Sequence, residues 1–405
     1  MKAIKISDRM TNVHSEIRGP LFVEAMEMQK RGINVLKLNT GNPAAFGFEL
    51  PESIRAALVG HEEKGVAYCD FKGMPDARAA ICEYHKSMGI VGVTPDDVFI
   101  GNGVSEVVSF ALLPLLNRGD EVLLPSPSYS LWGNTVNLSG AESVFYVCDE
   151  QSEWYPDLDD IRSKITPNTR AIVVINPNNP TGATYPVEIL QGIVDIAREH
   201  ELIIFADEIY DRLVMDGKVH TSIASLAPDL PVITMNGLSK SHCLCGYRCG
   251  WMIISGPREL TEEYRQGIVK LTSMRLCSNT LAQLVIPAAL NDIDTPRSMV
   301  SPGGRLYEQR EAAISEIAKI DGMSVVKNTA AFYIFPKLDI KKFNITNDKV
   351  FARDLLHATN ILIVPGSGFD WQTPDHFRIV MLPRADELRD AVRRMGEFLD
   401  GYKQK

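Results

Sequence analysis

The chain has 405 residues, of which 45% are hydrophobic, and its formal net charge at pH 7 is -9. A single hydrophobic core stops growing at about 250–300 residues, so we expect two domains rather than one. The acidic balance argues against a surface built to bind nucleic acid or anionic lipid, and no segment approaches the ~20 apolar residues of a membrane helix.

The first residues and the cysteines both favour a cytoplasmic protein. Residues 1–10 lack the apolar stretch of a secretory signal. The seven cysteines are an odd number scattered along the chain, which favours reduced thiols over a disulfide framework. Cys243, Cys245 and Cys249 lie close in sequence, but their spacing does not match a zinc-binding pair and no histidine pair is near. We therefore expect no metal site.

Short apolar runs predict strands along most of the chain. These runs are residues 98–100, 121–124, 144–147, 171–175, 202–205, 232–235 and 251–254. Runs that are short and apolar on both faces are typical of strands covered by helices on each side. Amphipathic segments such as residues 187–199 lie between them. The alternation predicts an α/β fold with a mostly parallel, seven-stranded, doubly wound sheet, whose ligands bind beyond the carboxyl ends of the strands.

The pattern changes after about residue 295. Turn-forming residues at 291–296 and 302–304 precede a charged helix at 308–320, and short strands follow at 324–326, 332–335, 362–364 and 377–380. This pattern predicts a smaller α+β domain. We expect residues 1–45 to form an N-terminal arm and part of the small domain, residues 46–295 the large domain, and residues 296–405 the small C-terminal domain.

Lys240 follows the predicted strand at 232–235, within the sequence Asn-Gly-Leu-Ser-Lys. A free lysine has a pKa of about 10.4 and attacks an aldehyde only when deprotonated, whereas attachment to a carbonyl cofactor uses the amine directly. Arg248, eight residues later, is placed to bind a phosphate with two hydrogen bonds. Taken alone, the Ser-Lys pair is a weak signal, because a surface lysine after a strand is the more common origin of such a pair.

Asp207 and Tyr210 follow the predicted strand at 202–205. A half-buried aspartate needs a cationic partner, and the protonated nitrogen of a pyridine cofactor is such a partner. Tyr210 is then placed to donate to the phenolic oxygen of the same ring. The alternative is an aspartate that caps a helix.

Two further polar segments follow predicted strands. In residues 176–182, two Asn-Pro pairs make a rigid turn that holds amide side chains, although it also fits a plain tight loop. In residues 101–106, Gly103 permits close backbone approach, Ser105 can cap the following helix, and the first N–H groups of that helix can bind a phosphate. A capped helix without a ligand is the alternative. Four such segments on one sheet favour a common ligand site.

These residues resemble those of the fold-type-I pyridoxal-phosphate enzymes, specifically the class I/II aminotransferases. The resemblance extends from about Ile17 to the C-terminus and includes Ala206-Asp207-Glu208-Ile209-Tyr210, Asn179-Pro180-Thr181-Gly182 and Ser239-Lys240. It is closest to bacterial alanine aminotransferases (glutamate–pyruvate transaminases), through residues 17–20, 38–43, 68–70 and 274–277.

The resemblance implies a role for each matching residue. Lys240 would form the Schiff base with pyridoxal 5′-phosphate and then act as the proton shuttle, Asp207 would pair with the pyridine nitrogen, and Asn179 and Tyr210 would bind the phenolic oxygen. The phosphate would bind Gly103, Val104, Ser105, Ser239 and Arg248, and Tyr129 would stack on the ring. The substrate would bind Arg378, Gly41, Asn179 and Arg18. Tyr68 would reach the phosphate of the neighbouring subunit, which implies a homodimer with shared sites.

Two positions depart from the family pattern. Many members have a serine where this chain has Gly237, so another group must replace it in phosphate binding. Dicarboxylate-specific members have an arginine where this chain has Met274, which argues against aspartate as the preferred donor, although the neighbouring Arg275 leaves the point open.

The implied activity is transfer of an amino group between an L-amino acid, with alanine favoured, and a 2-oxo acid such as 2-oxoglutarate or pyruvate, by a ping-pong mechanism. One alternative is a β-lyase, or an aminotransferase with another donor, on the same fold. Another is a cofactor-binding regulator without catalysis, but the chain has no basic segment for DNA binding.

Overall fold

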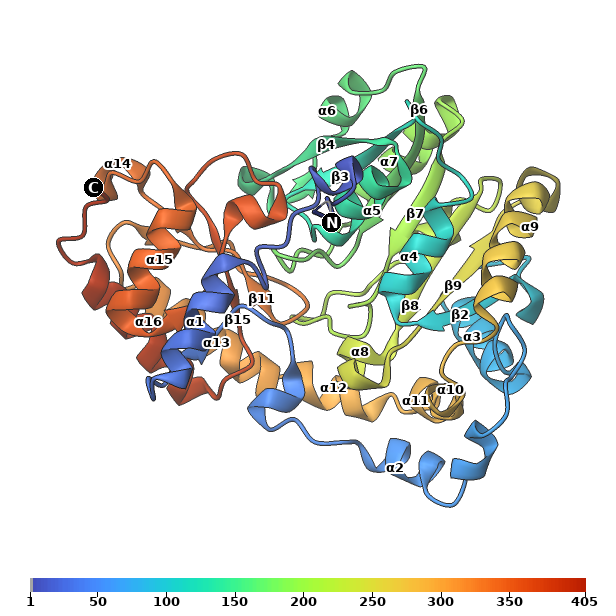
Figure 1. Ribbon diagram of the computed structural model, residues 1–405, viewed down its shortest axis with the longest axis horizontal. Helices are drawn as coiled ribbons and strands as arrows, with labels where there is room; N and C mark the ends of the chain where they lie inside the picture. Colours follow the sequence, from blue (N-terminus) through green and yellow to red (C-terminus); the bar gives the residue numbers. More distant parts are fainter. Residues whose placement is uncertain (1–2) are drawn as a thin grey trace.

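The computed structural model describes residues 3–405, and a large sheet occupies one side of it (Figure 1). In spatial order its strands are β2 (Val98–Asn102), β9 (Cys249–Ser255), β8 (Val232–Gly237), β7 (Ile203–Asp207), β6 (Thr169–Ile175), β3 (Glu121–Ser126), β4 (Glu142–Asp149) and β5 (Tyr155–Pro156). β9 is antiparallel to both its neighbours and β5 is antiparallel to β4, whereas the other pairs are parallel. The mostly parallel α/β fold is thus confirmed.

The predicted number of seven strands is wrong, because the sheet has eight. The additional strand is β5, which has only two residues, one of them proline, and pairs with the edge of β4. A segment this short carries no recognisable apolar pattern, since an edge strand needs neither length nor two buried faces.

Alternate residues of each central strand are buried by helices on opposite faces of the sheet. In β6, Val173 packs in the core formed with α4 (Val104–Leu112), α5 (Leu131–Ser139) and α9 (Arg258–Arg275). Its neighbour Val174 packs on the other side, with α3 (Pro75–Ser87), α6 (Leu158–Ser163), α7 (Val187–Glu199) and α11 (Ile286–Asn291). Burial on both faces explains why these strands are continuous apolar runs.

Most strands of the sheet have their carboxyl ends at one edge, where the antiparallel β9 begins. In this register Asp207 is opposite Ile175 and Met235, Gly237 is opposite Gly250, and Asn102 is opposite Cys249. The four polar segments singled out from the sequence therefore emerge along the same edge.

The C-terminal part has a second core around Phe351, Ile379 and Leu388. Its helices are α13 (Arg305–Ile317), α14 (Ile340–Phe343), α15 (Asp348–Thr359) and α16 (Ala385–Leu399). Its strands are β10 (Met323–Ser324) paired with β12 (Lys337–Leu338), and β11 (Tyr333–Ile334), β15 (Phe377–Val380) and β14 (Val364–Pro365) in one small sheet. The predicted strand at 377–380 has the bounds of β15, the strands predicted at 324–326 and 332–335 shorten to two residues each, and the one predicted at 362–364 is divided between β13 and β14.

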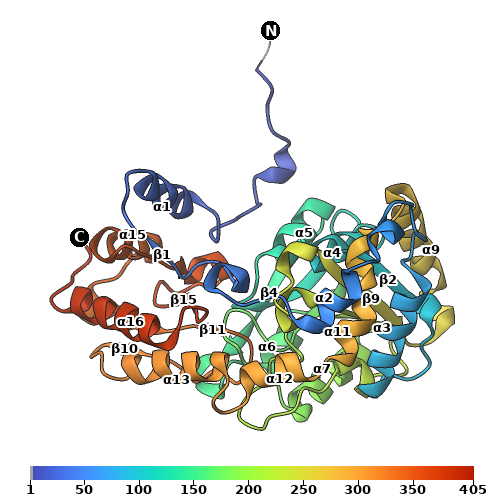
Figure 2. The ribbon, with the colours of Figure 1, turned by 90° about the horizontal axis from the view of Figure 1, so that it is seen from below.

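The N-terminal segment joins this C-terminal part. α1 (Pro20–Lys30) packs there, and β1 (Leu36–Lys37) pairs in parallel with β13 (Ile361–Leu362). The remaining helices α2 (Glu52–Leu58), α8 (Leu238–Ser241), α10 (Thr280–Leu284) and α12 (Asp294–Val300) lie near the sheet side. α12 and α13 follow one another from there toward the C-terminal part (Figures 1 and 2).

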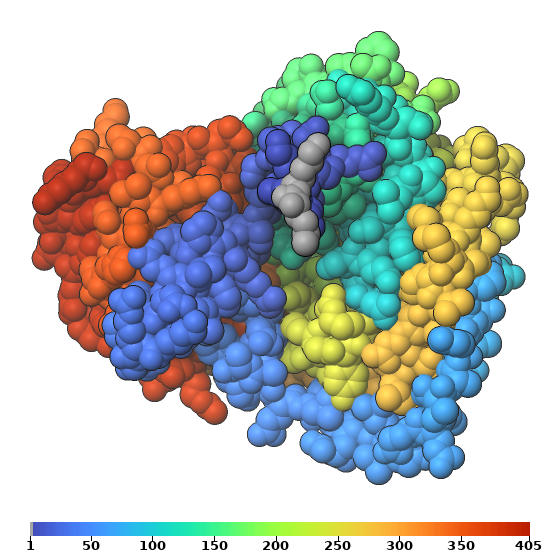
Figure 3. All heavy atoms as spheres, in the orientation of Figure 1, coloured from blue at the N-terminus to red at the C-terminus, as the bar shows by residue number. Residues whose placement is uncertain are grey.

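Residues 3–12 are exposed and project from the body of the molecule (Figure 2). The segment is attached at His14, whose backbone N–H donates to Asn134 on α5 at 2.9 Å. In space-filling view the blue N-terminal segment lies across the boundary between the sheet and the C-terminal helices (Figure 3). Among the described residues, no helix is long and apolar enough to span a membrane.

Candidate active site

Lys240 lies on α8, directly beyond β8, and its side chain is largely enclosed. Its Nζ donates to the backbone oxygen of Gly41 at 3.1 Å and lies 5.6 Å from the ring centroid of Phe332. Burial lowers the pKa of Lys240, but the surrounding Tyr333, Cys245 and Tyr129 side chains raise it, and the net pKa lies above the ordinary value. The ammonium must therefore lose a proton before its nitrogen can form a covalent bond.

Asp207 ends β7 and is 5% exposed. Its carboxylate accepts from Nε1 of Trp132 at 3.1 Å and from the backbone N–H of Ile209 at 3.3 Å. Burial raises the pKa of Asp207 to about 6. Within residues 3–405, no Lys, Arg or His nitrogen forms an ion pair with this carboxylate, and no helix follows for it to cap. A buried carboxylate of this kind suits a cationic ligand.

Asn179 and Tyr210 are both buried close to Arg378. The Asn179 Oδ1 accepts from Arg378 at 2.9 Å, and because a guanidinium only donates, the oxygen must face it and the amide nitrogen is left to donate elsewhere. Burial, followed by the adjacent Tyr333 hydroxyl, raises the pKa of Tyr210 well above its ordinary value. Tyr210 therefore keeps its proton and can donate it.

The beginning of α4 forms a narrow cradle with Arg248. A Cβ on Gly103 would lie 2.3 Å from Nη2 of Arg248, and a Cβ on Gly250 would lie 2.5 Å from the backbone nitrogen of Val104. The first N–H groups of a helix have no carbonyl partner within it, so those of Val104 and Ser105 are available to an anion beside the Arg248 guanidinium.

The expectation that Ser105 caps this helix is wrong. The N-cap is Gly103, with φ of 82°, and no side chain caps α4. Ser105 is instead the second residue of the helix and is exposed, so its hydroxyl remains free beside the cradle.

Arg378 on β15 is 1% exposed, and its only hydrogen-bond partners among residues 3–405 are neutral, namely Asn179 and the backbone oxygen of Asn39. Its guanidinium carbon lies over two aromatic rings, 4.5 Å from the centroid of Tyr333 and 4.7 Å from that of Phe369. Burial lowers the pKa of Arg378, and its Nε has no hydrogen-bond partner among the described residues. This arrangement suits a carboxylate ligand, which would supply the missing negative charge.

The backbone around Gly237 leaves no room for a serine. A Cβ there would lie 2.6 Å from the backbone oxygen of Cys249 and 3.0 Å from Cα of Gly250 on the paired strand. Ser239, two residues later, is partly exposed on α8, at the same sheet edge as the Gly103 cradle.

Arg275, the residue that left the substrate class open, is engaged within the chain. Its Nη1 forms an ion pair with Glu106, and its Nη2 donates to the backbone oxygens of Phe71 and Ile100. The preceding Met274 is 76% exposed. This region of the chain thus offers no free arginine to a second substrate carboxylate.

Three predicted site residues lie away from this group or at its margin. Tyr68 is 78% exposed, and Arg18 is exposed on the N-terminal segment, where its neighbour Ile17 accepts from Asn39 at 2.7 Å. Tyr129 follows β3 and is near enough to Lys240 and Arg378 to affect the pKa of each. The structure therefore brings together the residues beyond the sheet edge with Arg378 and Gly41, but not Tyr68.

The sequence reasoning missed Trp132, Tyr333, Phe369 and Asn39. A buried tryptophan or tyrosine needs a partner for its polar hydrogen, and this was the available signal for Trp132 and Tyr333. Phe369 and the backbone of Asn39 carried no such signal.

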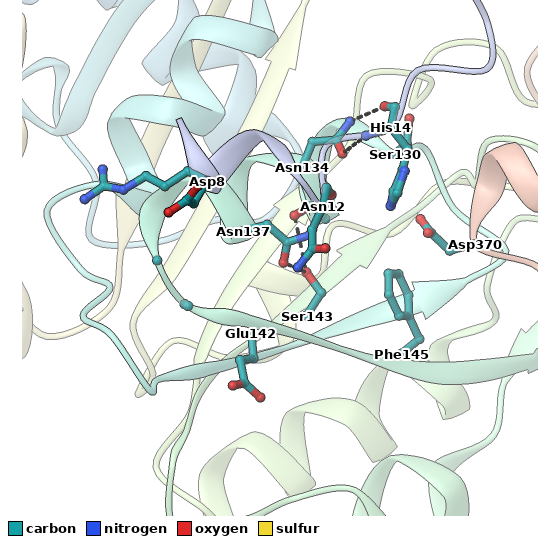
Figure 4. Close-up of a pocket in the computed structure, with 14 residues that line it drawn as sticks. Asp8, Asn12, His14, Ser130, Asn134, Asn137, Glu142, Ser143, Phe145 and Asp370 are labelled. Carbon is teal, nitrogen blue, oxygen red and sulfur yellow. Dashed lines mark hydrogen bonds between the residues drawn. The ribbon is translucent and has the colours of Figure 1, made fainter. Parts of the chain in front are cut away.

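A separate polar hollow of about 530 Å³ lies between the N-terminal segment and α5 (Figure 4). Its lining includes His14, Asn134, Ser143, Phe145 and Asp370. Burial raises the pKa of Asp370 to about 6, while His14 lowers it. None of the residues that surround Lys240 and Asp207 lines this hollow, so it is distinct from the candidate site.

An unpaired buried carboxylate, an amine, an anion cradle and a buried guanidinium are the groups needed to hold a phosphorylated pyridine aldehyde beside a carboxylate substrate. Consistent with these features, the chain belongs to the class I and II aminotransferases, whose family model matches residues 33–395. Enzymes of this family and fold depend on pyridoxal phosphate.

Individual relatives are similar over the whole chain. It is 49% identical to the glutamate-pyruvate aminotransferase AlaA of Haemophilus influenzae over 404 residues, covering 100% of both chains. It is 45% identical to the alanine aminotransferase of Mycobacterium tuberculosis, covering 100% of this chain and 94% of that one. The crystal structure of an Escherichia coli aminotransferase matches with a TM-score of 0.98 and 49% identity, covering 100% of both chains.

Proposed function

We propose that this chain is an aminotransferase that uses pyridoxal 5′-phosphate to move an amino group from L-alanine to 2-oxoglutarate and, in the reverse direction, from L-glutamate to pyruvate. The observation that carries the proposal is the grouping of three charged side chains: Lys240 is within electrostatic reach of both Asp207 and Arg378, and none of the three forms an ion pair among the described residues. The names of the similar relatives support alanine and glutamate as the amino acids.

The residues fit the cofactor chemically. When bound, pyridoxal phosphate supplies an aldehyde that joins to amines and a ring that accepts an electron pair from the substrate α-carbon. Asp207 would hold the pyridine nitrogen protonated, which in turn keeps the carboxylate charged. Tyr210 and the amide nitrogen of Asn179 would donate to the phenolic oxygen, and Tyr129 would stack on the ring.

The phosphate would be bound by the N–H groups of Val104 and Ser105 and by Arg248, with Ser239 contributing its hydroxyl. Gly103 and Gly250 allow this approach, because a side chain on either would enter the cradle. Since Gly237 has no room for a side chain, backbone groups and Ser239 would replace the serine of other family members.

Lys240 would perform the proton transfer. In its neutral form, the Nζ of Lys240 would accept the proton from the substrate α-carbon, hold it and later give it back, while the bound cofactor would supply the electron-accepting ring. Arg378 would fix the α-carboxylate with two charge-assisted hydrogen bonds, with the backbone at Gly41 nearby, so that the α-proton faces Lys240. Arg18 would be a second substrate contact from the N-terminal segment.

We also propose a homodimer with shared sites. Exposed apolar side chains gather around Tyr68, namely Val66, Met274, Leu276 and Leu281. The two segments that carry them lie together, because a Cβ on Gly65 would lie 2.5 Å from Leu281 and Arg275 donates to Phe71. A second copy covering this surface would bury the apolar residues and bring Tyr68 to the partner's phosphate.

We further propose a cytoplasmic location, and a division of the chain into a large domain at 46–295 and a small domain at 296–405. The seven free cysteines support a reducing compartment. Separate hydrophobic cores, two on the faces of the sheet and one around Phe351, support the two domains.

Half-reactions followed by visible absorbance test the function. Protein loaded with pyridoxal phosphate should lose the visible absorbance of the aldehyde form of the cofactor when it is mixed with alanine or glutamate. It should release the corresponding oxo acid in a 1:1 ratio to the cofactor. Aspartate and valine are the comparison amino acids, and a faster reaction with either of them would show a different donor specificity. A second oxo acid should restore the absorbance. Reaction with none of these amino acids would refute the proposal.

A β-lyase on the same fold is separated by its products. A lyase given a β-substituted alanine releases pyruvate and ammonia without an acceptor oxo acid, whereas a transaminase requires the acceptor for turnover. Size-exclusion chromatography with light scattering tests the dimer, and a monomer at micromolar concentration would contradict it.

A further inference from the structure

Tyr333 contacts three groups of the candidate site, and the proposed function assigns it no role. Its hydroxyl lies 3.0 Å from the Tyr210 hydroxyl, and its ring centroid lies 4.5 Å from Cζ of Arg378. A Cβ on Gly41 would lie 2.3 Å from the same hydroxyl, so Tyr333 also closely approaches the residue that accepts from Lys240. Tyr333 is 2% exposed, so its hydroxyl must find its partners inside the protein.

The backbone holds Tyr333 firmly in this position. Tyr333 begins β11, where it is opposite Val380 of β15, two residues from Arg378. Ala331, two residues before it, has a φ of 60°, a left-handed conformation that residues with a side chain rarely adopt. Its N–H donates to Leu213 at 2.9 Å. Such backbone conformations persist where the surroundings enforce them, often at functional sites.

The proposed function determines which of the two tyrosine hydroxyls donates the hydrogen bond between them. Each tyrosine hydroxyl has one proton to donate and can also accept. If Tyr210 gives its proton to the cofactor's phenolic oxygen, the Tyr210 oxygen is left to accept. Among residues 3–405, the Tyr333 hydroxyl is the group that lies within hydrogen-bonding distance of the Tyr210 oxygen. In the structure Tyr210 donates to Tyr333; with the Tyr210 proton directed at the phenolic oxygen instead, the bond reverses and Tyr333 becomes the donor.

On the basis of the proposed function, we infer that Tyr333 is a positioning residue whose hydroxyl and ring have separate roles. Its hydroxyl donates to Tyr210 and so directs the Tyr210 proton toward the phenolic oxygen of the cofactor. Its ring packs against the Arg378 guanidinium, which Phe369 also contacts, and so fixes the orientation of the group that would bind the substrate carboxylate.

The variant Tyr333→Phe separates the two parts, because it removes the hydroxyl and keeps the ring. In the full-length protein loaded with pyridoxal phosphate, the midpoint of the pH titration of visible absorbance should move upward by about half a unit to one unit. The reason is that a hydrogen bond to the phenolic oxygen stabilises its anion, and this bond weakens when Tyr210 loses its own donor. The KM for alanine should change by less than about threefold, whereas Tyr333→Leu, which also removes the ring, should raise it by about three- to tenfold.

A double variant tests whether Tyr333 acts through Tyr210. Tyr210→Phe alone should move the midpoint further than Tyr333→Phe, and adding Tyr333→Phe to it should cause no additional shift. The control is Tyr402→Phe, which removes a hydroxyl that donates to Asp354 at 2.7 Å in the C-terminal part and should leave the midpoint unchanged.

An unchanged midpoint in Tyr333→Phe, or an equal further shift in the double variant, would overturn the inference while leaving the proposed function intact. If the wild-type protein shows no visible absorbance with pyridoxal phosphate, the proposed function itself fails, and the inference fails with it.

Discussion

At the sheet edge, Asp207, Lys240 and Arg248 come from consecutive strands of one sheet, β7, β8 and the start of β9. On the opposite side of the site, Arg378 is held by Asn39 and Asn179, which lie 339 and 199 positions away in the chain. The first group depends on strand order alone. The second exists only when the N-terminal segment, the sheet side and the C-terminal part have all come together.

This difference separates two functions of the site. The sheet-edge group would hold and activate the cofactor, and it is fixed by continuous buried strands. The Arg378 group would bind the substrate, and it depends on contacts between parts of the chain that fold around different cores. Variants at the sheet edge should therefore impair the binding or activation of the cofactor, whereas variants around Arg378 should impair the binding of the substrate.

Lys240→Ala should have the largest effect, because it removes both the covalent attachment and the proton shuttle. We expect a loss of turnover of about 10³-fold or more, together with loss of the lysine-bound visible absorbance. Steady-state kinetics and absorbance spectra measure this. Lys349→Ala, which removes an exposed lysine paired with Glu16, is the control. Wild-type turnover in Lys240→Ala would remove the sheet-edge group from the mechanism.

Arg378→Met should affect the substrate and leave the cofactor in place. Because two charge-assisted hydrogen bonds to the substrate are lost, KM for alanine should rise by about 10²-fold, while the visible absorbance of bound pyridoxal phosphate stays as in the wild type. Titration with amino acid followed by absorbance measures both quantities.

The control for this variant is Arg353→Met, which removes a largely exposed arginine paired with Glu24. It should leave KM unchanged, since exposed ion pairs contribute little. If Arg378→Met instead released the cofactor, the two sides of the site would not be separable.

The sequence predicted the sheet-edge group well, and the reason is physical. Strands buried on both faces must be apolar throughout, so polar residues directly after them are conspicuous, and parallel strands bring their carboxyl ends to one edge. The α/β class and the seven principal strands followed from this pattern, and the family match confirms the resemblance to class I/II aminotransferases. The roles of Lys240, Asp207 and Arg248 stay predictions.

The opposite side could not be predicted in the same way. Arg378 was identified only through the family resemblance, because an arginine within a short strand has no distinguishing pattern. Tyr333 and Asn39 were missed, since their contacts depend on how distant segments pack. The same limit applies to β5, which is too short to recognise, and to Ser105, where Gly103 took the N-cap position because its φ is positive.

Asp207→Asn should change how the stability of the cofactor-free protein depends on pH. The pKa of Asp207 is about 6 in the folded chain against 3.8 for an unperturbed aspartate, so the folded state binds the proton more tightly. Stability of the cofactor-free protein should therefore fall as pH rises from about 4 to about 6, by up to about 3 kcal/mol from this group.

Urea unfolding of the cofactor-free protein at pH 4, 5, 6 and 7 measures this dependence. Asp207→Asn should lose that part of the decline and should also bind pyridoxal phosphate more weakly, because the pyridine nitrogen loses its counter-charge. Asp195→Asn, at an exposed position paired with Arg198, should keep the wild-type dependence. Identical pH curves for the wild type and Asp207→Asn would show that burial does not perturb this carboxylate.

Gly237→Ser should have the smallest effect, and it tests how closely the predictable side of the site is packed. The serine Cβ would lie 2.6 Å from the backbone oxygen of Cys249, so β8 and β9 must move apart at the point where Lys240 and Arg248 emerge. We expect a loss of about 1–3 kcal/mol in the free energy of unfolding, and weaker binding of pyridoxal phosphate because the two cofactor-binding residues separate. Gly246→Ser is the matched control, since a Cβ at Gly246 meets no atom within 4 Å. The opposite outcome is a stable Gly237→Ser protein that binds the cofactor more tightly. It would mean that the strands adapt and that the added hydroxyl reaches the phosphate. The packing of β9 would then not require the glycine.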